Sequence, residues 1–276
     1  AAVIAGYGNK IVSVLKENGG QASAMNAGFA ASHGEIICML DADDVFLPEK
    51  VETVVEFFQK SPDIGWVFTE SAPRETDVIE QLAFSTLCQK IRSESRQFDS
   101  EEINFRQNVS AGKIPDFAPS TSNLCFARTV LEKIFPLPEV RGISGMAISD
   151  LYIHTLAIGL SNGYFTQRDL GIYRHHGGNM NSLSFPKRRR KMAEKNMTTG
   201  YWIQRNFPEF RAISDKFISK GFSTYLSSSY PKSHTADITC EGLLKSYLTE
   251  STPFKGIQIF LMIFYYWLRL RFQKFV

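Results

Sequence analysis

Apolar and polar positions follow a regular order along the first 70 residues. Short apolar segments predict strands at 11–15, 35–40 and 64–69. The second of these is apolar throughout its interior, which is typical of a strand buried on both faces. Between the strands, 22–32 is rich in alanine with helical spacing, and the segment after Pro48 has an apolar stripe with the same spacing. This alternation predicts an α/β fold with a mostly parallel sheet flanked by helices.

The order is less regular in the rest of the chain. Helices are predicted at 129–134, 151–160 and 184–207, and the last is basic and then aromatic. Near the C-terminus, 257–268 reads IQIFLMIFYYWL, which is shorter than the roughly 20 apolar residues that span a bilayer. Lysine and arginine flank this segment, so 254–276 suits an interfacial membrane helix or a terminal helix that packs on the core.

The composition is that of an ordinary globular protein. The 276 residues are 43% hydrophobic and 21% charged, which excludes disordered, collagen-like and disulfide-scaffold classes. The four cysteines form no CxxC pair, so a cysteine zinc site is not expected, and nothing demands an oxidising compartment.

Charge is distributed unevenly along the chain. Residues 1–140 hold 20 acids and 12 bases, a net charge of −8, whereas 141–276 hold 8 acids and 19 bases, a net charge of +11. A basic half favours binding of phosphates, anionic lipid or nucleic acid, or is simply a solubilising surface. No nucleic-acid-binding motif is present, so nucleic acid is not expected as a partner.

The segment 40–44, LDADD, places three carboxylates at the end of a buried strand. Ligands of open α/β sheets bind at the carboxyl ends of strands, and carboxylates there suit Mg²⁺ or Mn²⁺. Asp43 or Asp44 could equally cap the helix that follows. These residues alone leave both interpretations open.

Two blocks of sequence resemble family 2 glycosyltransferases. In the first, NGGQ at 18–21, AMNAG at 24–28, ASHG at 31–34 and ICMLDADD at 37–44 are similar to the family's G-Q loop, A-x-N-x-G helix, A-x-x-G turn and strand running into D-x-D. In the second, LGIYRHHGGN at 170–179 is similar to the family's Y-R-x-H-x-x-N element. The resemblance implies a Rossmann-like GT-A fold and inverting transfer of a sugar from a nucleotide-diphosphate-sugar donor to an acceptor hydroxyl.

The resemblance also implies roles for individual residues. It implies that the metal, Mn²⁺ or Mg²⁺, is bound by Asp43, Asp41 and His176. It implies that the donor is bound by Gly19, Gly20, Gln21, Asn26, Asp41 and Arg174. Asn26 could equally be a buried amide that pins its helix to the strand. Asp150 is the expected general base, although Ser149 stands where the family usually has a second acid, and Asp150 could also cap the helix it precedes.

We therefore expect a GT-A domain over 1–183 and a helical, basic extension over 184–276. The family normally begins with a strand, a helix and a second strand that this chain does not contain, so an N-terminally truncated enzyme is expected. The expected acceptor is a cell-surface polysaccharide or glycolipid, with the basic run 187–191 and the helix 254–276 near an anionic membrane surface. The expected location is cytoplasmic, on the inner face of the membrane. The alternative is a non-catalytic, membrane-associated remnant of the same fold.

Overall fold

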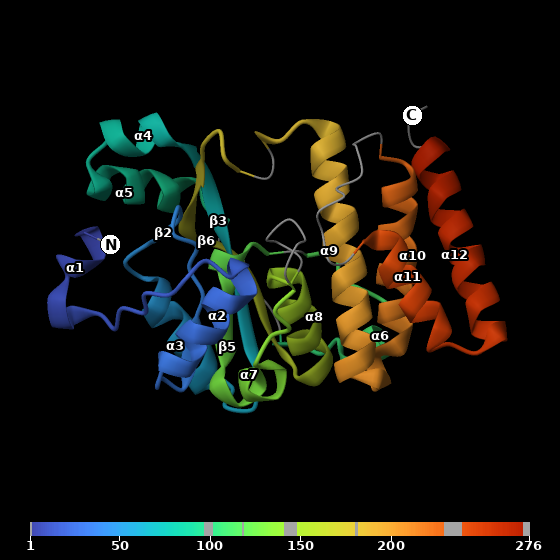
Figure 1. Cartoon of the computed structure of the whole chain (residues 1–276). Coiled ribbons are helices and arrows are strands. Elements are labelled where there is room, and N and C mark those ends of the chain that lie inside the picture. The colour runs from blue at the N-terminus through green and yellow to red at the C-terminus, as the bar shows by residue number, and fades with distance from the viewer. Residues whose placement is uncertain are drawn as a thin grey trace.

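The computed structural model describes residues 2–96, 102–117, 119–140, 148–179, 182–228 and 239–272. A sheet flanked by helices lies on one side of the molecule, and a group of long helices formed by the C-terminal part of the chain lies on the other (Figure 1). The chain begins on the sheet side and ends at the far edge of the helical side (Figure 1). The α/β class and the helical C-terminal region are thus as expected from the sequence.

The sheet is mixed. It has six strands, which are β1 (Ile36–Cys38), β2 (Val45–Phe46), β3 (Trp66–Glu75), β4 (Glu102–Ile103), β5 (Leu124–Ala127) and β6 (Gly163–His175). Their order is β1-β5-β3-β6-β2, with β4 also paired to β6. Only β3 and β6 pair in parallel, and the other pairs are antiparallel.

The expectation of a mostly parallel sheet was therefore wrong. Strands β1 and β3 do run in the same direction, as a strand-helix-strand unit requires, but β5 lies antiparallel between them. Apolar periodicity reports which segments form strands. It does not report which distant strand is inserted between two sequential ones.

The expected strand at 11–15 was also wrong. This segment has no regular secondary structure, and Val12 and Leu15 are 78% and 69% exposed. A strand is stable only where a neighbour satisfies its backbone hydrogen bonds. Among the described residues, β1 pairs with β5, and no strand pairs with the segment 11–15.

Helices cover the sheet on both faces. They are α1 (Ala2–Ala5), α2 (Gly20–Ala31), α3 (Lys50–Lys60), α4 (Thr76–Gln81), α5 (Phe84–Glu94), α6 (Arg106–Ser110), α7 (Arg128–Ile134) and α8 (Asp150–Leu160). Short 3₁₀ turns occur at Gly8–Lys10, Thr121–Asn123 and Pro208–Phe210. The helices expected at 22–32, 129–134 and 151–160 are confirmed. The main core lies between β3, β5 and α8, where Trp66, Phe126 and Tyr152 are fully buried.

The C-terminal region is a set of packed helices. They are α9 (Phe185–Asn206), α10 (Arg211–Leu226), α11 (Cys240–Thr249) and α12 (Pro253–Phe272). Gly221 lets α10 approach α9 closely, since a Cβ there would lie 2.6 Å from the Met197 side chain. Residues 273–276 of the expected helix 254–276 lie outside the described residues. Within the described chain, no helix combines the length and apolarity needed to cross a bilayer.

Candidate functional site

The acidic segment 41–44 forms a loop between β1 and β2. The Asp44 amide donates to the Asp41 carbonyl at 3.1 Å, which closes a turn. Asp44 Oδ2 accepts from Ser122 Oγ at 2.7 Å, and Asp44 Oδ1 accepts from the Arg174 amide at 3.1 Å. Asp44 therefore fastens the loop to β6 and to the turn before β5, and both of its oxygens are occupied by these contacts.

The two sequence motifs meet at Asp43. His176 Nε2 lies 2.8 Å from Asp43 Oδ2, and Arg174 Nε donates to the Asp43 carbonyl at 2.9 Å. The Gly178 amide donates to His176 Nδ1 at 3.1 Å. In a neutral imidazole this contact places the proton on Nε2, facing the carboxylate. Parallel pairing of β6 with β3 carries Arg174 and His176 to the sheet edge where the acidic loop lies.

Asp41 lies in a negative environment. Burial raises its pKa to about 6, and the neighbouring negative charges of Asp44, Asp43 and Asp150 add to the rise. A hydrogen bond from Thr121 acts in the opposite direction and lowers the pKa. A cation bound here would relieve this repulsion. Asp150, at the start of α8, is one of the charges that act on Asp41.

A divalent metal at this site would need oxygen or imidazole ligands. Within the described ranges, no three His, Cys, Asp or Glu side chains are gathered as a ready metal site. Asp43 supplies a carboxylate oxygen, and His176 Nε2 would become a nitrogen ligand if its proton moved to Nδ1, which would end the contact with the Gly178 amide. Mg²⁺ and Mn²⁺ bind proteins through few side chains when substrate phosphates complete the shell, and Mn²⁺ accepts imidazole. The residues present thus fit a metal that is shared with a diphosphate.

The glycine-glutamine segment lies beside the acidic loop. Gly20 opens α2 with a φ of +84°, which favours glycine. Gln21 Nε2 donates to Thr121 Oγ1 at 3.3 Å, and Thr121 in turn hydrogen-bonds Asp41. Gln21 and Asp41 also line one cavity of about 430 Å³ between α2 and β1. Gly19 precedes Gly20, and a Cβ at Gly19 would lie 2.6 Å from Ser23 Oγ.

Asn26 makes contacts away from the acidic loop. Its Nδ2 donates to the Leu137 carbonyl at 2.9 Å and to Glu139 Oε1 at 3.1 Å. Its Oδ1 accepts from the Leu137 amide at 2.7 Å. The half-buried side chain thus has a structural role, but it joins α2 to the segment after α7 and not to a strand.

Asp150 is the first residue of α8. Its Oδ1 accepts from Ser149 Oγ at 2.7 Å, from the Leu151 amide at 2.8 Å and from Lys195 Nζ at 2.6 Å. Burial opposes ionisation, but the Lys195 ammonium, helped by the Ser149 hydroxyl and by His154, outweighs burial and lowers the pKa of Asp150. Asp150 is therefore a carboxylate at neutral pH, and the Leu151 contact shows that it also serves the helix N-terminus.

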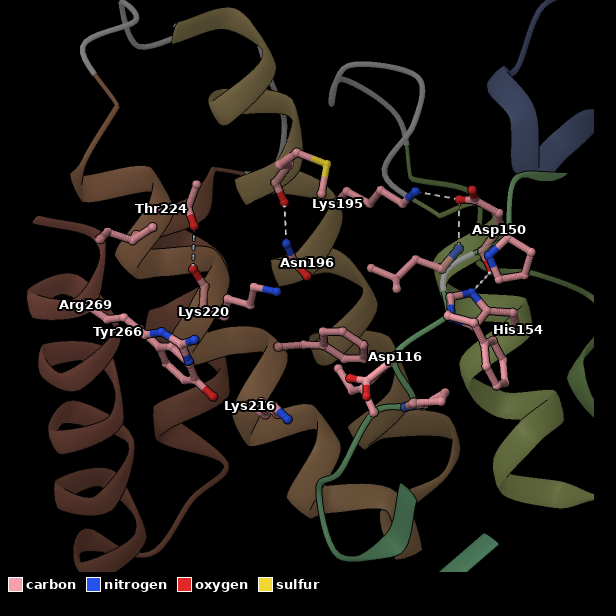
Figure 2. Close-up of a pocket in the computed structure, with 18 of the residues that line it drawn as sticks. Asp116, Asp150, His154, Lys195, Asn196, Lys216, Lys220, Thr224, Tyr266 and Arg269 are labelled. Carbon is pink, nitrogen blue, oxygen red and sulfur yellow. Dashed lines mark hydrogen bonds and ion pairs between the residues drawn. The ribbon is translucent and has the colours of Figure 1, made fainter. Parts of the chain in front are cut away.

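A cavity of about 660 Å³ opens from Asp150 toward the helical region. Figure 2 shows Asp150 and His154 of α8, Lys195 of α9, Lys216 and Lys220 of α10 and Arg269 of α12 around it. His154 Nδ1 lies 2.9 Å from the Asp150 carbonyl. A cavity of this size suits a small substrate.

The sequence analysis missed Lys50 and Ser122. Ser122 Oγ accepts from the Asp41 amide at 3.0 Å and donates to Asp44, so it holds both ends of the acidic loop. Lys50 is fully buried behind it, donates to Thr69 Oγ1, and lies 3.4 Å from the Ser122 carbonyl. Burial lowers the pKa of Lys50. Lys50 is four residues before Val54 on the apolar stripe of α3, and this spacing could have identified it.

The basic run 187–191 is not a uniform charged surface. Arg190 is buried, contacts Glu194 Oε1 at 3.0 Å and lies 4.2 Å from the Tyr225 ring centroid. Lys187 is exposed. The cation in contact with Asp150 is Lys195, just beyond this run, and no motif identified it.

Comparisons with known proteins place the sequence among glycosyltransferases. Residues 1–129 match the model described as glycosyl transferase family 2. An uncharacterized glycosyltransferase of Nostoc sp. is 33% identical over 171 residues, which are 62% of this chain and 49% of that protein. Undecaprenyl-phosphate 4-deoxy-4-formamido-L-arabinose transferase of Pectobacterium atrosepticum is 35% identical over 82 residues, 30% of this chain and 24% of that one.

The chain thus matches about half, or less, of the length of these two curated relatives. The crystal structure of S. aureus TarS residues 1–349 superposes with a TM-score of 0.48 and 13% identity. That superposition covers 89% of this chain and 64% of the other.

Proposed function

Because the chain belongs to glycosyl transferase family 2, we propose that it transfers a sugar from a nucleotide-diphosphate-sugar donor to an acceptor hydroxyl, with inversion. Its α/β sheet and helical C-terminal region are those expected of a GT-A-type enzyme. The contact of His176 with Asp43 carries the proposal, because it joins two motifs that are 133 residues apart in the sequence.

The donor would bind over the acidic loop. A metal held by Asp43 and His176, with Asp41 close by, would neutralise charge on the departing diphosphate. Arg174 holds the main chain of the loop through Asp43 and adds positive charge beside it. Gln21 is linked to Asp41 through Thr121, which hydrogen-bonds both side chains. The donor could therefore also contact Gln21 and the adjoining Gly19 and Gly20.

The acceptor would bind in the cavity next to Asp150. The Asp150 carboxylate takes the proton of the acceptor hydroxyl while its oxygen bonds to the anomeric carbon and the bond to the diphosphate breaks. Lys195 keeps Asp150 ionised and holds Oδ1 in place. Among the described residues, the three donors to this side chain all contact Oδ1. Oδ2 is therefore the atom that would receive the proton.

The test separates donor binding from transfer. Nucleotide-sugars are screened with Mn²⁺, and release of the nucleoside diphosphate is measured with a panel of saccharide and lipid-linked acceptors. D150N should keep metal-dependent donor binding and lose about 10²–10⁴-fold in transfer rate, as loss of a general base does. K187M, on the exposed start of α9, is the matched control. Absence of metal-dependent donor binding in the unaltered protein would refute the proposal.

A membrane surface is a second proposed partner. Phe254, Leu261 and Phe264 of α12 are 70%, 64% and 57% exposed, while Ile259 and Ile263 pack on the helical core. Arg269 and Arg271 lie in the last turn of the same helix. We propose that this face lies in the interface of an anionic membrane, as on a cytoplasmic leaflet. The name of the Pectobacterium relative, an undecaprenyl-phosphate transferase, supports a lipid-linked acceptor there.

A non-catalytic, membrane-associated module remains the competing function. Such a module would also bind the membrane through the exposed face of α12. It would bind vesicles but release no nucleoside diphosphate from any donor. The donor screen therefore decides between the two.

A further inference from the structure

The cavity beside Asp150 holds more positive than negative charge. Its walls contain the cations Lys195, Lys216, Lys220 and Arg269 and the carboxylates Asp116 and Asp150. Lys195 is already paired with Asp150. Three cations and one carboxylate are left around a space of about 660 Å³.

The three remaining cations come from two helices. Lys216 and Lys220 are one turn apart on α10, and Arg269 lies on the neighbouring helix α12, on the side away from Asp150 (Figure 2). Within the part of the chain that the structure describes, no carboxylate lies within 4.0 Å of any of the three. Lys216 Nζ does donate to the Gly112 carbonyl at 3.1 Å, which fixes its position without neutralising it.

The lysine pair is electrostatically unfavourable without an anion. Burial and the neighbouring Lys220 ammonium lower the pKa of Lys216. Like charges four residues apart destabilise a helix, and an anion between them would reverse that effect. The cavity is otherwise lined by Phe117, Phe217 and Tyr266, whose rings can pack against the rest of an acceptor.

We propose that this cavity binds an acceptor that carries a phosphate group, held by Lys216, Lys220 and Arg269, with the acceptor hydroxyl directed to Asp150. The inference rests on the proposed function, which it deepens by naming the chemical class of the acceptor. Phosphate suits these three cations better than a neutral saccharide, because each of them can donate a charge-assisted hydrogen bond to a phosphate oxygen. The phosphate could belong to a lipid carrier or to a phosphorylated saccharide.

The experiment measures binding without donor or metal, so it does not depend on turnover. Calorimetric titrations use farnesyl phosphate below its micellar concentration, glucose 6-phosphate and inorganic phosphate. Farnesol and glucose are the neutral counterparts, and potassium chloride controls for ionic strength. At least one phosphate ester should bind tenfold more tightly than its neutral counterpart. The farnesyl and glucose arms distinguish a lipid source from a saccharide source.

Variants locate the phosphate. The double variant K216M/K220M and the variant R269Q should each weaken phosphate binding tenfold or more. K245M, which removes an exposed lysine of α11 outside this cavity, should leave binding unchanged. Thermal unfolding of each variant checks that the fold is retained, and R269Q gives an independent result if the double variant unfolds.

Each outcome bears on the proposal. It is overturned if no phosphate binds more tightly than its neutral counterpart, or if K216M/K220M and R269Q bind phosphate as well as K245M does. Failure of the proposed function would give a different result. Phosphate would then bind with the expected variant pattern, but no nucleotide-sugar would release its diphosphate with any acceptor.

Discussion

The ion pair between Lys195 and Asp150 gives the sharpest prediction. Nζ and Oδ1 are 2.6 Å apart, and the two side chains are only 13% and 21% exposed. Replacement of Lys195 by methionine keeps the volume of the side chain and removes its charge. Asp150 then remains mostly buried with Ser149 and the Leu151 amide as its donors.

The size of the effect follows from the burial of the pair. Breaking a fully buried pair costs about 3–5 kcal/mol, and a hydrogen bond to a charged group contributes about 1.5–3 kcal/mol. Because both side chains still reach solvent, we expect K195M to lower the free energy of unfolding by about 2–3 kcal/mol at neutral pH. K195R should restore most of this loss, and K187M on the same helix should change it by less than about 0.5 kcal/mol.

The pH dependence distinguishes this mechanism from a packing defect. Lys195 lowers the pKa of Asp150 in the folded protein, so the pair stabilises the fold above the ordinary aspartate value of about 3.9. That contribution is lost as the pH falls through the lower, folded pKa. In K195M, the largest opposition to burial is removed, so the pKa of Asp150 should rise although the Ser149 hydroxyl still donates to it. The difference in stability between the two proteins should therefore shrink as Asp150 becomes protonated in the variant.

The assay is urea unfolding followed by tryptophan fluorescence, from about pH 7.5 down to about pH 4.5. The acid limb of kcat/KM should also move to higher pH in K195M, because that limb reports the free-enzyme pKa of the base. A loss of stability that is the same at every pH would refute the electrostatic account. An acid limb that does not move would show that Asp150 is not the base.

Three further predictions concern other parts of the molecule. D43N should abolish the Mn²⁺ dependence of donor binding measured by titration while leaving thermal stability nearly unchanged, since the Asp43 side chain is 38% exposed. The double variant L261S/F264S should lower binding to anionic vesicles about tenfold or more in co-sedimentation, because each side chain buried in the interface contributes about 1.5–3 kcal/mol; equal binding would remove α12 from the contact. G163A should destabilise the protein by about 1–3 kcal/mol in denaturant unfolding, since its Cβ would lie 2.2 Å from the Trp66 carbonyl; a neutral result would contradict the close approach of β3 and β6.

Much of the local structure was readable from the sequence. The apolar runs predicted β1 and β3, and helical spacing predicted α2, α3, α7, α8 and α9. These features depend on residues within one or two turns of one another, where periodicity and capping act. The family resemblance of 18–44 and 170–179 likewise depends on residues close in sequence.

The strand order, and the absence of a strand at 11–15, could not be predicted from such local patterns. Insertion of β5 between β1 and β3 depends on pairing between residues about 90 apart, and β5 itself is only four residues long. The segment 11–15 has the composition of a strand, but the described chain offers it no hydrogen-bonded neighbour. Strand formation needs a partner, and a single sequence does not say whether the partner is available.

The sequence by itself indicated the resemblance to family 2 glycosyltransferases, several of the helices, and Asp43, His176 and Asp150 as candidate residues. Only the tertiary structure decided which side chains meet. It placed His176 against Asp43 and put Lys195 on the Asp150 carboxylate. It also brought Lys216, Lys220 and Arg269 around one cavity. Local propensity acts over a few residues, whereas the charge environment of a site is created by chain segments that fold together from far apart.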